Sequence, residues 1–439
     1  MRRSTWWPLL LALLAPTFAQ SPVPTICAEE FCRCDSFTRV ICDCTAADNE
    51  VTLRPNGAYS VPSTTTGIII NGCARVHFLA ETARNLIQLR TVELTNVGHV
   101  VINDHALAWS PFSRENEMQP GIRIVIRNST INDISSYAIQ GRVNDIIITD
   151  STIDNMRPFA FSSLRGVRNV ELTNNVFRNI AIQAFKQFTA VNFILRGGSI
   201  ENLPSRFLSD VEVTDLFHMD GVAVGHISSL AFFVNSPKRV LIESNTIDTL
   251  EADGFHMVSH GSITFRNNSV TTLRKNSFLG FTVAPEITSV KGRLEILIDN
   301  NTITNLTPMS LIHNRTTLNL RVDGLNLNVP CTCELAEEWR VLVREQGVIN
   351  CWYDLEGHFI SVPTFVDSRC GTFKQTFWIF VVIGVLVVVI IASIVTFIIV
   401  RRENEKKKKV QIVLPDGKTY RETEFHIVVE RAELLTTDL

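Results

Sequence analysis

A frame of about 23 residues recurs along the middle of the 439-residue chain, and it constrains the fold more than any other feature. Three clear copies read "DIIITDSTIDNMRPFAF", "NVELTNNVFRNIAIQAF" and "RVLIESNTIDTLEADGF", and end at Phe161, Phe185 and Phe255. Each copy has an apolar-x-apolar strand, a small polar residue in the following turn, and further apolar residues that close the unit. No unit of this size can bury its own apolar face, so the copies are expected to stack into a solenoid with parallel strands.

The small polar residue of the frame lies where an Asn or Asp side chain can bond free backbone groups of neighbouring coils. Successive copies are 22 to 25 residues apart, except for one step of 33 that contains an insertion around residues 283–292. An earlier and looser copy covers residues 92–107. The predicted positions are Ser129, Ser151, Asn175, Gly198, Asp220, Asn245, Asn268, Asn301 and Asp323.

The repeat resembles the leucine-rich repeat family, which has a period of 20–29 residues and a recurrent Asn. The resemblance covers about residues 85–328 and implies an α/β-type horseshoe solenoid with a parallel β-sheet. Val and Ile replace much of the Leu, and the first Leu of the pattern is absent at positions such as Arg239 and Arg293. A right-handed parallel β-helix is therefore the alternative fold.

Cysteines flank the repeats in two clusters that resemble the caps of that family, and caps cover the core that end coils would otherwise expose. An even number on both sides of the repeats predicts disulfides and an oxidising compartment. Cys44 and Cys73 are additional to the usual cap and can pair with each other, while the six N-terminal cysteines allow fifteen connectivities. The clusters are Cys27, Cys32, Cys34, Cys42, Cys44 and Cys73, and then Cys331, Cys333, Cys351 and Cys370.

Two apolar segments predict how the chain meets the membrane. Arg2 and Arg3 precede an apolar run with small residues near Ala19, which is typical of a cleaved signal peptide. Residues 377–400 carry no charge and span about 36 Å as a helix, enough to cross a bilayer. The basic run at 401–409 then places the C-terminus in the cytosol, as in a type I protein of the plasma membrane.

The predicted organisation follows from these segments. It comprises a signal peptide (1–19), an N-terminal cap (20–84), the solenoid (85–328), a C-terminal cap (329–370), a linker (371–376), a transmembrane helix (377–400) and a cytoplasmic tail (401–439).

The residue between the two inward apolar positions of each strand points outward, because strand side chains alternate. The predicted outward row is Val125, Ile147, Glu171, Ile194, Leu216, Leu241, Thr264 and Leu297. Six of these eight are aliphatic, which predicts an exposed apolar ribbon of the kind that marks a protein interface.

Potential N-glycosylation sites narrow this prediction to residues 140–260, where there is no sequon. The five sequons are at Asn128, Asn267, Asn300, Asn305 and Asn314. The predicted binding face is Ile147, Thr149, Glu171, Thr173, Ile194, Arg196, Leu216, His218, Leu241 and Glu243.

The tail carries two short signals. Glu430, Leu434 and Leu435 resemble an acidic dileucine sorting motif, which predicts clathrin-adaptor binding and endosomal cycling. The C-terminal Thr437, Asp438 and Leu439 resemble a class I PDZ ligand, which binds by strand addition.

No catalytic motif accompanies the solenoid, and the net charge of −3 gives no indication of nucleic-acid binding. His256 and His260 are four residues apart but lack a third ligand, so they are interpreted as a solvated pair and no metal or cofactor is expected. The sequence predicts a non-enzymatic cell-surface recognition protein, an adhesion molecule or receptor that binds a protein, possibly itself. An auxiliary or trafficking subunit of another membrane protein is the alternative, and an extracellular carbohydrate-active β-helix enzyme is a remote one.

Overall fold

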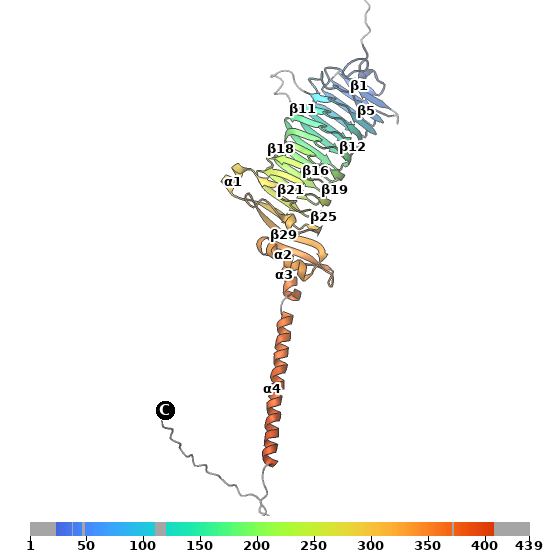
Figure 1. Ribbon diagram of the computed structural model, residues 1–439. Helices are drawn as coiled ribbons and strands as arrows, with labels where there is room; N and C mark the ends of the chain where they lie inside the picture. Colours follow the sequence, from blue (N-terminus) through green and yellow to red (C-terminus); the bar gives the residue numbers. More distant parts are fainter. Residues whose placement is uncertain (1–22, 37, 46–48, 110–119, 371–372, 408–439) are drawn as a thin grey trace, which may run out of the picture. The chain divides into compact units, whose positions relative to one another are not determined.

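The chain forms a parallel β-solenoid of about 12 turns, followed by a long apolar helix (Figure 1). The computed structural model describes residues 23–407, apart from 37, 46–48, 110–119 and 371–372. One compact unit ends at Cys370 and a second begins at Gly371. The predicted signal peptide and the tail from residue 408 onward, with its two short signals, lie outside the described residues.

Each full turn of the solenoid adds one strand to each of up to three parallel sheets. The first sheet is formed by β2 (Arg39–Asp43), β4 (Gly67–Asn71), β6 (Thr91–Thr95), β9 (Ile122–Arg127), the later part of β11 (Ile139–Thr149), β14 (Val167–Thr173), the later parts of β16 (Phe185–Arg196) and β18 (Leu208–Asp220), β21 (Arg239–Glu243), β24 (Ser262–Arg266), β27 (Leu294–Asp299) and the start of β29 (Leu318–Pro330).

The second sheet follows the first after a tight corner. Its strands are β3 (Glu50–Leu53), β5 (Arg75–Phe78), β7 (His99–Ile102), β10 (Thr130–Ile134), β12 (Thr152–Met156), β15 (Val176–Ile180), β17 (Ser199–Leu203), β19 (Ala223–Ile227), β22 (Thr246–Leu250), β25 (Ser269–Leu273), β28 (Thr302–Asn305), the end of β29 and β30 (Gly347–Tyr353).

The third sheet is shorter. It contains β8 (Leu107–Trp109), the starts of β11, β16 and β18, and the strands β13 (Phe161–Arg165), β20 (Phe232–Asn235), β23 (Phe255–Ser259) and β26 (Phe281–Val283). The solenoid that the sequence predicted is confirmed. Its second and third sheets provide strands on the sides where a leucine-rich horseshoe can carry helices.

The corner between the first and second sheets explains the recurrent polar residues. The first corner residue has a left-handed backbone in successive coils, with φ of 54° at Asn174, 58° at Gly197 and 54° at Asn267. Asn and Gly tolerate this conformation best, which is why they recur there. The next residue points inward, and at Asn245 and Asn268 its amide is buried and bonds backbone groups of neighbouring coils.

Two predicted positions of this inward column are wrong by two residues. Val222 occupies the position assigned to Asp220, because the Val222 N–H donates to Asn245 Oδ1 at 2.9 Å. Likewise Asn301 lies opposite Leu325, because Thr302 pairs with Asn326. Neither Val222 nor Leu325 carries the polar side chain that marks this position in other coils, whereas Asp220 and Asp323, two residues earlier, do carry one.

The core is apolar and rich in phenylalanine. Phe185 stacks on Phe161 with ring centres 4.5 Å apart, and Phe232 stacks on Phe255 at 4.9 Å. Phe193 and Phe217 stack at 5.9 Å beneath the first sheet. Rings from successive coils therefore fill the interior along the middle of the solenoid.

Disulfide-bonded segments close both ends. At the N-terminal end, η1 (Ile26–Ala28) precedes β1 (Cys32–Asp35), which pairs antiparallel with β2. At the other end β31 (His358–Ser361) pairs antiparallel with β30, beside α2 (Cys333–Gln346), α3 (Val362–Phe365) and η4 (Val366–Cys370). The pairs are Cys27–Cys34, Cys32–Cys42, Cys44–Cys73, Cys331–Cys351 and Cys333–Cys370.

The remaining helical segments of the described residues are α1 (Pro285–Lys291), η3 (Pro308–Leu311) and α4 (Phe373–Lys407). The 33-residue step of the repeat contains α1, which projects from the stack of strands (Figure 1). A second 3₁₀ turn, η3, lies between β28 and β29. The last helix, α4, contains a 30-residue stretch from Phe377 to Lys406 that is long and apolar enough to cross a membrane.

Candidate functional site

The outer face of the first sheet carries the predicted binding residues in two columns. One column runs Ile147, Glu171, Ile194, His218 and Leu241 along five adjacent strands. The second, one outward position later on each strand, runs Thr149, Thr173, Arg196, Asp220 and Glu243. Nine of the ten predicted residues therefore lie side by side in register.

The tenth residue, Leu216, requires a correction. It also points away from the core, but it pairs with Asn192 and Arg239 in a different column. His218 takes the position between Ile194 and Leu241 that Leu216 was expected to fill. The error has the same origin as the Asp220 assignment, because a slip of two residues preserves the inward–outward alternation. His218 therefore replaces Leu216 in the predicted apolar row, and Val125 of that row is buried, so the row exposes fewer aliphatic residues than predicted.

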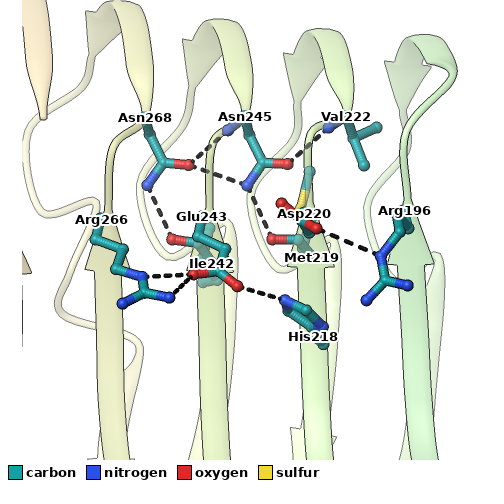
Figure 2. A network of polar contacts seen from close by, with 10 residues as sticks. All are labelled: Arg196, His218, Met219, Asp220, Val222, Ile242, Glu243, Asn245, Arg266 and Asn268. Carbon is teal, nitrogen blue, oxygen red and sulfur yellow. Dashed lines mark hydrogen bonds and ion pairs between the residues drawn. The ribbon is translucent and has the colours of Figure 1, made fainter.

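Ionisable side chains of this face form two neighbouring groups of polar contacts at the corner, which together are called the network (Figure 2). Nε2 of His218 lies 2.8 Å from Oε1 of Glu243, and Arg266 donates to Oε2 of the same carboxylate. On the adjacent strand, Nε of Arg196 lies 3.3 Å from Oδ2 of Asp220. Two arginines thus balance two carboxylates, and the network is neutral when His218 is neutral.

The side chains of this network differ in burial, and burial and ion pairing have opposite effects on the pKa of Glu243. The side chains of His218 and Glu243 are mostly buried, whereas the two arginines are about half exposed. Burial alone would raise the pKa of the Glu243 carboxyl. The hydrogen bonds and charges of Arg266 and His218 outweigh that effect, and the pKa is lowered from its ordinary value of 4.5.

The same residues form a potential metal-ligand set. The ligand atoms of His218, Asp220 and Glu243 lie within 4.8 Å of one another. However, Arg196 and Arg266 already neutralise the two carboxylates, and a divalent cation would have to displace or repel both guanidinium groups. The arrangement favours a closed ion-pair network over a cation site.

His256 and His260, which are four residues apart in the sequence, contact different side chains. His256 stacks on Phe233 with ring centres 5.0 Å apart, while His260 lies 3.4 Å from the carboxylate of Glu286. Each imidazole therefore has its own neighbour.

Two members of the network were missed as binding residues. Asp220 had been assigned to the turn, and Arg266 lies beyond the window that the sequons defined. The spacing of the outward positions would have identified both residues. Asp220 and Glu243 are 23 residues apart, as are Glu243 and Arg266, and each pair lies on adjacent strands.

The sequons occupy two settings. Asn128, Asn267 and Asn300 are exposed at the same left-handed corner position. Asn305 is exposed at the end of β28, whereas Asn314 is half-buried and its Oδ1 accepts a bond from Thr316 N–H at 3.1 Å. Between Asn128 and Asn267 this corner has no sequon, and the network lies in that interval.

The network predicts a pH-dependent contribution to stability. Glu243→Gln is expected to lower the free energy of unfolding by about 1–2 kcal/mol at pH 7, because Arg266 and His218 lose a charged partner. The native carboxyl has a pKa below 4.5, so the native state binds fewer protons than the unfolded chain. The contribution is therefore full above about pH 4.5 and is lost as the pH falls through the lowered pKa.

Urea denaturation of the full chain in detergent, repeated from pH 7 downward, measures this difference. The matched control is Glu295→Gln, whose partner Arg321 lies 3.8 Å away on an exposed surface, and we expect a change below about 0.5 kcal/mol. A difference between wild type and Glu243→Gln that stays constant down to about pH 3 would contradict the assignment.

Compared with models of known protein families and with curated proteins, the chain matches none.

Proposed function

We propose that this protein is a cell-surface recognition protein, an adhesion molecule or receptor, that binds a protein partner through the outer face of the first sheet. The observation that carries the proposal is the pairing of two columns on one rigid surface. Ile147, Ile194 and Leu241 alternate with ionisable residues, and the neighbouring column holds the neutral ion-pair network. A centre of aliphatic anchors beside fixed charges is the composition from which specific protein interfaces are built.

The setting of the solenoid supports this proposal. Five disulfides and one apolar helix are consistent with a single-pass protein whose solenoid is in an oxidising compartment. We propose type I topology at the plasma membrane, with a cleaved signal peptide, glycans on the sequons and a tail that binds PDZ and clathrin-adaptor proteins. The kinship with leucine-rich repeat proteins is likewise a proposal, and it rests on the repeat length, the recurrent Asn and the flanking cysteines.

We assign no hydrolytic activity to the two carboxylates of the network. A general acid or base must be free to exchange a proton with its substrate. Each of Asp220 and Glu243 is instead bound to an arginine, and the lowered pKa of Glu243 keeps it charged. Recognition is the use that this geometry supports best.

The test is the substitution of two aliphatic anchors, Ile194→Asp with Leu241→Asp, in the full chain displayed on cells. We expect at least a roughly tenfold loss of binding to whichever protein is retained from a panel of cell-surface proteins that includes the chain itself. Both side chains are half-buried and point away from the core, so the fold should tolerate the change.

The matched control is Thr249→Asp with Thr272→Asp, two adjacent outward residues of the second sheet. Surface labelling of intact cells confirms that each variant is folded and exported. Full binding by the Ile194/Leu241 variant, at equal surface level, would contradict the proposed face.

A further inference from the structure

The second sheet contains a hollow on the opposite side of the corner from the ion-pair network. It has a volume of about 410 Å³ and lies over β15, β17, β19 and β22. Small side chains at Ser199, Ala223 and Gly225 leave the space open. Gly225 is required there, because a Cβ atom would lie 2.5 Å from the carbonyl oxygen of Glu201.

The lining of this hollow includes one exposed apolar side chain and two acidic side chains. Val176 contributes the apolar side chain and is 40% exposed. Glu201 and Asp248 are exposed, and neither has an ion-pair partner in the described part of the chain. Arg178, the one cation of the lining, is already bound to Asp154 at 3.0 Å. The hollow therefore suits a small apolar group flanked by positive charge.

The same chain presents such a group on another side. Helix α1 ends with Val290 and Lys291, and Gly292 and Arg293 follow. Val290 is 83% exposed, the highest value among the large apolar residues described. Lys291 and Arg293 are exposed and have no ion-pair partner among the described residues. We name Val290, Lys291 and Arg293 the knob.

We propose that the knob of one molecule docks in the hollow of a second copy. Val290 would enter beside Val176, with Lys291 and Arg293 facing Glu201 and Asp248. The insertion with α1 joins the third sheet to the first, whereas the hollow is on the second sheet, so a knob cannot fill its own hollow (Figure 1). The contact joins two different surfaces, the knob of one molecule and the hollow of another.

This contact deepens the proposed function, because it names a second copy of the chain as one partner. It rests on the proposed function only in that the solenoid recognises a protein. It uses a surface separate from the outer face of the first sheet. The two can therefore fail independently.

Charge reversal tests the contact in liposomes that carry only the purified full chain. Glu201→Lys with Asp248→Lys reverses the hollow, and Lys291→Glu with Arg293→Glu reverses the knob. Each reversed protein alone should lose liposome clustering by about tenfold or more, measured by light scattering, because like charges then face each other. Liposomes with the two reversed proteins, when mixed, should cluster again, since each reversed knob then meets a reversed hollow.

The control for net charge is Lys238→Glu with Lys275→Glu, two exposed lysines that belong to neither the knob nor the lining of the hollow, which should cluster like wild type. Absence of clustering by the wild-type chain, or unchanged clustering by the reversed proteins, would overturn the contact and leave the first-sheet proposal standing. Loss in each reversed protein without recovery on mixing would also overturn it, because complementarity between copies is what the mixture tests.

Discussion

Replacing Asn268 with valine is expected to lower the free energy of unfolding by about 3–5 kcal/mol. The side chain is buried, and its Nδ2 donates to the Ile242 carbonyl at 2.9 Å and to Asn301 Oδ1 at 3.0 Å. Its Oδ1 accepts the backbone N–H of Asn245 at 3.0 Å. Valine fits the space, as Val222 does in the same column, but it leaves these buried groups without partners, and each costs about 1–3 kcal/mol.

Hydrogen exchange of the amides in β21 and β24 measures this loss locally, which suits a solenoid whose coils contact only their neighbours. The control is Asn174→Gly at the exposed corner position, where Gly197 has the same left-handed backbone in the next coil. We expect a change below about 0.5 kcal/mol there. Equal protection in Asn268→Val and wild type would show that the inward amides do not hold the coils together.

The sequence predicted the solenoid because its two strongest signals are local. Alternation within one strand and a repeat of about 23 residues are both visible in residues such as Val240, Ile242 and Asn245. These two signals did not predict the second and third sheets of each coil. Ile247 and Leu250 are three residues apart, a spacing that suits a helical turn. In β22 the two residues between them, Asp248 and Thr249, both point outward, and the segment is a strand.

For the candidate site, the sequence predicts which side chains of a strand point outward, but not which side chains of different coils are in contact. Outward orientation was available for Ile194, His218 and Glu243 from their own strands. The contact between His218 and Glu243 joins residues 25 apart and depends on the register between two coils. The sequence does not reveal that register, because the inward corner column has Val222 where the next two coils have Asn245 and Asn268. The network therefore emerged only from the paired strands.

Phe185→Ala is expected to cost about 3–5 kcal/mol, because it removes the most connected ring of the core. Phe185 is fully buried, and its ring centre lies 4.5 Å from that of Phe161 and 5.3 Å from that of Phe207. Phe193 contacts it edge-on at 5.8 Å. The neighbouring rings are held by their own strands and cannot collapse into the space, so a cavity remains.

This substitution also separates packing from recognition, because β16 carries Phe185 on the third sheet and then Ile194 and Arg196 on the binding face. Loss of the ring should raise the hydrogen-exchange rate of the β16 amides and weaken partner binding through local opening. Phe185→Leu is the matched control, since Leu208 fills the equivalent position in the next coil, and we expect a cost of about 1–1.5 kcal/mol with binding retained. If the alanine variant opened β16 yet bound its partner at full strength, the rigid first-sheet surface would not be what the partner recognises.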